Sequence, residues 1–132
     1  MRKQVRLLVV DDHPEFCDLV KEIVDLSGHV FEITCEFAAN KAAAKSLMKT
    51  FEPSVVLLDA HLEDGNSLQC LEDWKHLPAQ VVVTSVQNSP SIEKAARNGG
   101  ASGYCPKSNK IEDVERLVHE LAEMAGDAYR IH

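Results

Sequence analysis

Short apolar runs alternate along this chain with longer amphipathic segments, and this alternation constrains the fold more than any other feature. The runs at residues 5–10 and 54–58 are almost entirely aliphatic, as expected of strands buried on both faces. Between them, apolar residues recur at helical spacing, first in a segment that Pro14 opens. Strands that alternate with helices in this way predict a parallel sheet covered by helices on both sides.

Five strand–helix pairs are expected along the chain. The predicted strands cover residues 5–10, 30–37, 54–58, 80–83 and 102–105, and the predicted helices cover residues 14–26, 39–50, 67–75, 89–97 and 111–124. Gly28 is expected to end the first helix, and Gly99 and Gly100 the fourth. Right-handed crossovers leave few topologies for such a chain. We therefore predict a single doubly wound α/β domain over residues 1–132, with strand order 2-1-3-4-5.

The composition excludes several classes of function. The formal net charge of −7 makes the domain a poor candidate for direct binding of nucleic acid, which needs a basic face. The apolar runs are too short to span a membrane, and the one behind the basic N-terminus ends at two aspartates, which excludes a normal signal peptide. We therefore expect a cytoplasmic protein. The cysteines are scattered without metal-site spacing and are assigned no chemistry; they are Cys17, Cys35, Cys70 and Cys105.

Polar side chains follow the predicted strands at the point where each strand ends. Asp11 and Asp12 follow the first strand and Asp59 follows the third. Thr84 ends the fourth strand, and Lys107 lies just past the fifth. The carboxyl ends of parallel strands meet at one edge of the sheet, and the binding crevice of a doubly wound fold lies there. We therefore expect these five side chains to converge on one site.

Three converging carboxylates repel one another, so one of them takes up a proton unless a cation is present. Ligands that are all oxygen favour a hard ion such as Mg²⁺, and Lys107 supplies a further positive charge. The alternative is that Asp11 and Asp12 only cap the first helix. No glycine-rich loop follows the first strand, which argues against a dinucleotide site or a P-loop.

Four stretches, taken in order, resemble the receiver domains of two-component response regulators. They are Leu-Leu-Val-Val-Asp-Asp-His-Pro (7–14), Val-Val-Leu-Leu-Asp (55–59), Val-Val-Val-Thr-Ser (81–85) and Gly-Ala-Ser-Gly-Tyr-Cys-Pro-Lys-Ser (100–108). The resemblance covers essentially the whole chain. It implies a flavodoxin-like (βα)5 fold and a phosphorylation-dependent signalling switch that is not a turnover enzyme. The first and last stretches look most like receivers that precede LuxR-type helix-turn-helix outputs.

The resemblance implies a phosphoacceptor and a metal site. Asp59 would accept a phosphoryl group from a sensor histidine kinase or a phosphotransfer protein. Asp12 would ligate Mg²⁺ directly and Asp11 mostly through water, together with Asp59 and the backbone carbonyl of His61. The His61 side chain could in addition set the lifetime of the phosphoryl group, although a plain exposed loop histidine is the simpler interpretation.

The resemblance also implies how phosphorylation is read. Lys107 would pair with Asp59 and then with the phosphoryl oxygens, and Thr84 would form a hydrogen bond to the phosphoryl group. Tyr104 would be an aromatic switch that turns inward once Thr84 moves. The response would reach a downstream output protein or output domain through the fourth helix, fifth strand and fifth helix, and a homodimer is left open.

The loop after Asp59 departs from the family pattern. Glu63 stands where many receivers have proline, and Ser67 where a glycine is often found. Ser108 replaces the proline that usually follows the lysine, so the local peptide geometry, often cis in the family, is an open question.

Three other functions remain to be weighed. The segment Asp59-Ala-His61 with a later glycine is similar to the motif of cobalamin carriers, but its spacing and position differ. A haloacid-dehalogenase-like phosphatase needs a second aspartate where His61 stands. The third is a receiver fold that binds partners without being phosphorylated. The presence of the acid pair Asp11 and Asp12, of Thr84 and of Lys107 argues against this third function.

Overall fold

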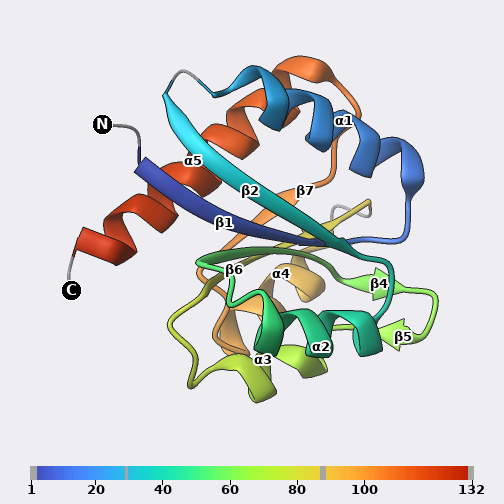
Figure 1. Cartoon of the computed structure of the whole chain (residues 1–132). Helices are drawn as coiled ribbons and strands as arrows, with labels where there is room; N and C mark the ends of the chain where they lie inside the picture. The colour runs from blue at the N-terminus through green and yellow to red at the C-terminus, as the bar shows by residue number, and fades with distance from the viewer. Residues whose placement is uncertain (1–2, 29, 87–88, 131–132) are drawn as a thin grey trace.

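Five parallel strands form one sheet in the order β2-β1-β3-β6-β7 (Figure 1). We describe a computed structural model over residues 3–28, 30–86 and 89–130. The strands are β1 (Lys3–Val10), β2 (Phe31–Ala38), β3 (Val55–Asp59), β6 (Gln80–Ser85) and β7 (Gly103–Pro106). Counting these five strands along the chain gives the order 2-1-3-4-5. The predicted flavodoxin-like, doubly wound fold is therefore confirmed.

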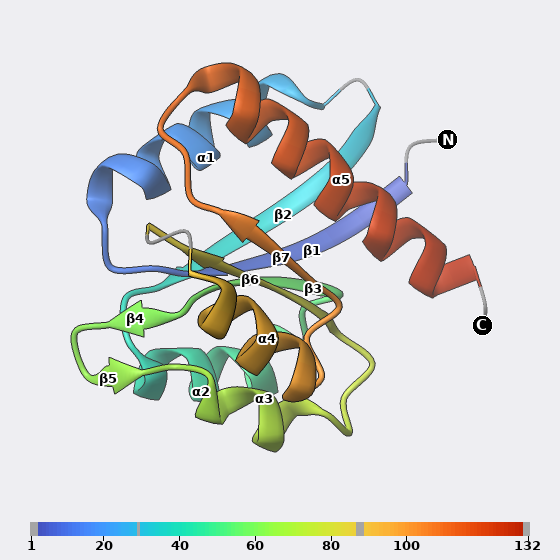
Figure 2. The same cartoon turned by 180° about the vertical axis from the view of Figure 1, so that it is seen from behind.

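The helices lie in two layers, one on each face of the sheet. Helices α1 (Pro14–Leu26) and α5 (Ile111–Arg130) cover one face. Helices α2 (Lys41–Thr50), α3 (Gln69–Trp74) and α4 (Pro90–Asn98) cover the other (Figures 1 and 2). Within the described ranges, none of these helices combines the length and the apolar character needed to cross a membrane.

Both faces of the central strands are buried, and this explains their uninterrupted aliphatic sequence. Leu7 and Val9 of β1 belong to the core that α1 and α5 complete. Leu8 and Val10, which point the other way, belong to the core beneath α2, α3 and α4. Full burial of each such side chain is worth about 1.5–3 kcal/mol. The aliphatic run is therefore required by two cores rather than one.

The strand register places the tips of the inner strands level with one another. Val10 pairs with Leu58, so Asp11, which follows β1, and Asp59, which ends β3, lie at the same height in the sheet. Asp59 pairs in turn with Thr84, and Thr84 with Cys105. The hydrogen-bonded ladder alone thus brings the predicted polar residues to one edge of the sheet.

The ends of two helices test the predicted role of glycine. Gly100 has φ +101°, and its N–H and that of Ala101 donate to Arg97 O at 3.1 Å and Ala96 O at 3.0 Å, which closes α4 in a Schellman motif as predicted. Helix α1 ends at Leu26, and Ser27 is its C-cap: the Ser27 N–H donates to Val24 O and the Ser27 hydroxyl donates to Ile23 O. Gly28 lies one residue past this cap, the position that Gly100 has in α4, so α1 ends where the glycine predicted.

A short hairpin follows β3 and was not predicted. It pairs β4 (His61–Leu62) with β5 (Gly65–Asn66), and Gly65 at φ +114° makes the turn. Each strand has only two residues, which is too short to show a periodic pattern. Asp64 in the turn accepts a hydrogen bond from the backbone N–H of Lys41 at 3.0 Å. This bond ties the hairpin to the first turn of α2, so the loop is restrained without the proline that Glu63 replaces.

Candidate functional site

Asp59, at the end of β3, has a contact on each of its two carboxylate oxygens. Its side chain is buried, and its Oδ1 accepts a hydrogen bond from the His61 backbone N–H at 3.1 Å. Its Oδ2 lies 3.2 Å from Lys107 Nζ. The Ser67 hydroxyl donates to the Asp59 backbone carbonyl, and the next residue, Ala60, donates its N–H to Thr84 O. The carboxylate is therefore fixed in direction as well as in position.

Asp11 and Asp12 meet Asp59 at this edge of the sheet. Asp11 is buried, whereas the Asp12 side chain is 21% exposed. Together with His13, the three aspartates offer ligand atoms that all lie within 4.8 Å of one another. The interpretation that the acids only cap α1 is wrong, because His13, and neither aspartate, is the N-cap residue of that helix.

Lys107 lies between the buried carboxylates. Its side chain is only 6% exposed, and its Nζ lies 2.7 Å from Asp11 Oδ2 and 3.2 Å from Asp59 Oδ2. The ammonium also lies 4.9 Å from the centroid of the Phe16 ring. One ammonium cannot neutralise three ionised carboxylates. The surplus negative charge and the oxygen donors fit a hard divalent cation.

The Asp59 pKa is raised above the ordinary value for aspartate. Burial is the largest cause, and the negative charge of Asp11 adds to it. The His61 N–H and the Lys107 ammonium oppose the rise, but less strongly. Ionisation of Asp59 is therefore less favourable in the folded protein than for an ordinary aspartate, as expected of a site that a cation completes.

Asp59→Asn is expected to stabilise the protein at neutral pH in the presence of EDTA. The amide carries no charge that burial would penalise, so we expect the free energy of unfolding to rise. Since the folded-state pKa lies above the unfolded value, the folded state binds more protons between the two, and the wild type loses stability as pH rises through that interval. Urea unfolding at a series of pH values, followed by the fluorescence of the buried Trp74, measures the free energy of unfolding of both proteins.

The advantage of Asp59→Asn should disappear below the ordinary range of aspartate pKa values, where the wild-type carboxyl is protonated in both states. Asp25→Asn, on the exposed face of α1, is the control and should show no such pH-dependent gain. A variant that is less stable than the wild type at neutral pH would contradict the raised pKa.

Thr84, the predicted phosphoryl-binding hydroxyl, is fully buried. Its Oγ1 has no hydrogen-bond partner among the residues that the structure describes. An unpaired buried hydroxyl is unfavourable by about 1–3 kcal/mol, so such a group is uncommon. Tyr104, the predicted switch, is half-buried and packs against the core beneath α4. The structure thus places Thr84 next to Asp59 with its hydroxyl unpaired among the described residues, and Tyr104 on the neighbouring strand, opposite Val83.

His13 and Ser67 belong to the site but were not predicted. The His13 ring lies among the carboxylates, and its Nδ1 is 2.9 Å from Asp11 Oδ1. Its place directly after the acid pair, in the same turn, was the available signal. Ser67 is fully buried and holds the carbonyl of Asp59, where the resemblance led us to expect glycine. A small polar residue in that position gave no pattern that could identify this bond.

The remaining loop residues fit simpler interpretations. The His61 side chain is exposed, and its backbone N–H makes the contact to Asp59. The described residues contain no cis peptide, so the bond between Lys107 and Ser108 is trans. Burial raises the pKa of the Cys17 thiol to about 11 and that of Cys35 to about 12, so both stay protonated and unreactive at neutral pH.

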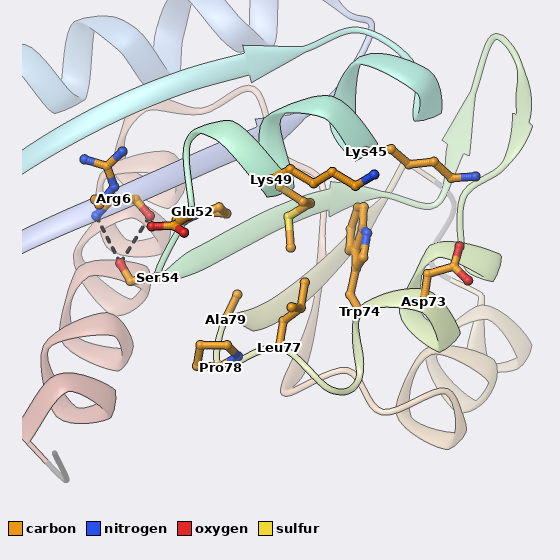
Figure 3. Close-up of a pocket in the computed structure, with 12 residues that line it drawn as sticks. Arg6, Lys45, Lys49, Glu52, Ser54, Asp73, Trp74, Leu77, Pro78 and Ala79 are labelled. Atoms are coloured by element: carbon orange, nitrogen blue, oxygen red, sulfur yellow. Dashed lines mark hydrogen bonds between the residues drawn. The ribbon is translucent and has the colours of Figure 1, made fainter.

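A hollow of about 950 Å³ opens elsewhere, beyond the amino ends of β3 and β6 (Figure 3). Trp74, Leu77 and Met48 give it an apolar wall between α2 and α3. Arg6 and Ser54 are hydrogen-bonded to each other at its rim. None of the predicted site residues lines it, so it is separate from the carboxylate cluster.

The fold and the carboxylate site define a receiver domain, and comparison with known families agrees. Residues 7–119 match the response regulator receiver domain family. The chain belongs to this family. Membership excludes the cobalamin carrier and the dehalogenase-like phosphatase, and it supports a phosphoacceptor signalling switch.

Individual relatives point to one branch of that family. The chain is 29% identical over 118 residues to the nitrate/nitrite response regulator protein NarL of Escherichia coli K12, covering 88% of this chain and 54% of that protein. It is 32% identical over 123 residues to the probable transcriptional regulatory protein NarL of Mycobacterium tuberculosis, covering 92% and 56%. The receiver domain of a Mycobacterium tuberculosis NarL superposes with a TM-score of 0.77 at 30% identity, covering 92% of this chain and 98% of that one. The chain therefore spans about half the length of the curated relatives it matches, and it is similar to the receivers of LuxR-like regulators.

Proposed function

We propose that residues 1–132 form one receiver domain that switches when Asp59 is phosphorylated. The observation that carries this proposal is the buried cluster at the strand tips. There Asp59 and Asp11 share Lys107, and the Thr84 hydroxyl on the adjoining strand has no partner among the described residues. A phosphoryl group on Asp59 would give that hydroxyl an acceptor.

The chemistry is a phosphoryl transfer to a carboxylate. An oxygen of Asp59 attacks phosphorus, and the new O–P bond forms as the P–N bond to a phosphohistidine of a sensor kinase or phosphotransfer protein breaks. The transferred group carries spread negative charge, so the protein mainly positions and neutralises it. Lys107 supplies positive charge at the right place, and the His61 N–H holds Asp59 in direction.

Mg²⁺ is the cofactor that the donor set fits. Asp11, Asp12, Asp59 and the backbone carbonyl of His61 would hold it, and the ion would supply the charge neutralisation that one lysine cannot. The surplus negative charge and the raised pKa of Asp59 both support a cation here.

Thr84 and Tyr104 would transmit the conformational change from the phosphorylation site to the rest of the domain. Movement of Thr84 toward the phosphoryl group would open space for the Tyr104 ring and change the face made by α4, β7 and α5. The matched relatives are described as transcriptional and response regulators, and we propose a LuxR-type output domain or a separate output protein as the target. On this view the chain is a cytoplasmic switch that is not a turnover enzyme and does not itself bind nucleic acid; it could also pair as a homodimer.

Incubation with acetyl phosphate and Mg²⁺, followed by intact mass measurement, tests the proposal. We expect the wild-type chain to gain one phosphoryl group and Asp59→Asn to gain none. Exposed Asp73→Asn is the matched control and should be modified like the wild type. An unmodified wild-type chain would leave only a partner-binding receiver without phosphorylation.

A further inference from the structure

His13 places a nitrogen atom inside the carboxylate cluster. Its Nδ1 lies 2.9 Å from Asp11 Oδ1, 3.3 Å from Asp12 Oδ1 and 3.4 Å from Asp59 Oδ2. Neighbouring ligands of a small divalent ion in an octahedral shell of about 2.1 Å radius lie about 3 Å apart. The spacing of this nitrogen from the three oxygens is close to that of ligands around one ion.

The backbone holds His13 in this position. The residue is the N-cap of α1 at φ −94° and ψ 105°, and Pro14 behind it restricts it to extended conformations. Its N–H donates to Asp11 Oδ1 at 2.9 Å, and its carbonyl accepts from Cys17 N at 3.1 Å. The ring therefore leans over Asp11 because both neighbouring peptide groups are fixed.

The contacts of Nδ1 are not all compatible with one protonation state. Lys107 Nζ, which can only donate, lies 2.7 Å from Nδ1, so that contact needs a lone pair on the nitrogen. The carboxylate oxygens around it need a proton there, or a cation between them and the nitrogen. A metal ion bound by Nδ1 and by one oxygen of each of the three aspartates would give all four atoms a cation as partner. Lys107 would then lose its contact with Nδ1 but keep its contacts with Asp11 and Asp59.

We propose that His13 Nδ1 is a ligand of the divalent metal site, which makes the site a mixed nitrogen and oxygen site. This inference rests on the metal site of the proposed function. Imidazole suits borderline metals, whereas Mg²⁺ prefers oxygen and water. The site therefore binds Mn²⁺ with a larger preference over Mg²⁺ than three carboxylates alone give.

The test uses Mn²⁺ as a paramagnetic probe on the full chain, without phosphorylation, at mildly alkaline pH. Pulsed electron paramagnetic resonance of the Mn²⁺-loaded wild type should show nitrogen hyperfine coupling from the coordinated imidazole. The coupling should be absent in His13→Ala, which removes the imidazole nitrogen and leaves the backbone hydrogen bonds of the turn in place. His76→Ala, an exposed histidine after α3, should retain it.

Calorimetric titration gives a second readout. His13→Ala should weaken Mn²⁺ binding roughly tenfold or more, as loss of a group that tunes a metal site does, and should change Mg²⁺ binding much less. His13→Phe keeps a ring without the nitrogen and should behave like His13→Ala. Wild-type affinity for Mn²⁺ in His13→Phe, or tighter Mg²⁺ binding in His13→Ala, would overturn the inference. Either result would show that the His13 ring occupies the metal position in the ion-free protein and is not a ligand.

The outcomes separate this inference from the proposed function. If the wild type binds no Mn²⁺ at all, the proposed metal site fails and the inference fails with it. If the wild type binds Mn²⁺ without nitrogen coupling, only the inference about His13 fails.

Discussion

Lys107→Met is expected to destabilise the metal-free protein by about 3 kcal/mol, because it leaves buried carboxylates without their cation. Lys107 Nζ lies 2.7 Å from Asp11 Oδ2 and 3.2 Å from Asp59 Oδ2, and all three side chains are at least nine-tenths buried. Methionine fills a similar volume, so the loss reports charge rather than packing. Urea unfolding in EDTA, followed by Trp74 fluorescence, measures the change.

A divalent cation should restore part of this loss. Mg²⁺ brings the positive charge that the variant lacks, so the stability it adds should be larger in Lys107→Met than in the wild type. Lys110→Met, an exposed lysine shortly after Lys107, is the matched control and should lie within about 0.5 kcal/mol of the wild type. Equal losses in the two variants would show that Lys107 does not neutralise the cluster.

The sheet could be predicted from the sequence because the central strands β1 and β3 are aliphatic runs that end at aspartates and alternate with helical patterns. Once β1 and β3 are neighbours, the positions of Asp11 and Asp59 follow from the register alone. The sequence was therefore sufficient to predict which residues lie together in the site. It does not establish the role of each residue, and those roles stay predictions.

What could not be predicted depends on side-chain direction and on very short elements. The place of His13 depends on how the turn before Pro14 is fixed, and the sequence shows only that the histidine is adjacent to the acids. Lys107 was expected to pair with Asp59, yet its shorter contact is to Asp11, because both carboxylates face the same ammonium. The link from Ser67 to the Asp59 carbonyl depends on a hairpin with strands of two residues.

Thr84→Val is expected to stabilise the unphosphorylated protein while removing its response to phosphorylation. Thr84 is fully buried, and its hydroxyl has no hydrogen-bond partner in the described part of the chain. Valine removes the unpaired hydroxyl, keeps the branched shape and suits a strand, so the free energy of unfolding should rise by about 1–2 kcal/mol. Urea unfolding measures the gain.

The same substitution should uncouple phosphorylation from the change in shape. Asp59 keeps its contacts to Lys107 and to the His61 N–H, so Thr84→Val should still be modified by acetyl phosphate. Without the hydroxyl, the α4–β7 region should lose its phosphorylation-dependent change in hydrogen exchange. Thr84→Ser keeps the hydroxyl but loses a buried methyl group, so it should be less stable than the wild type and still respond. A Thr84→Val protein that is destabilised, or that responds like the wild type, would show that the unpaired hydroxyl is not the group that reads the phosphoryl.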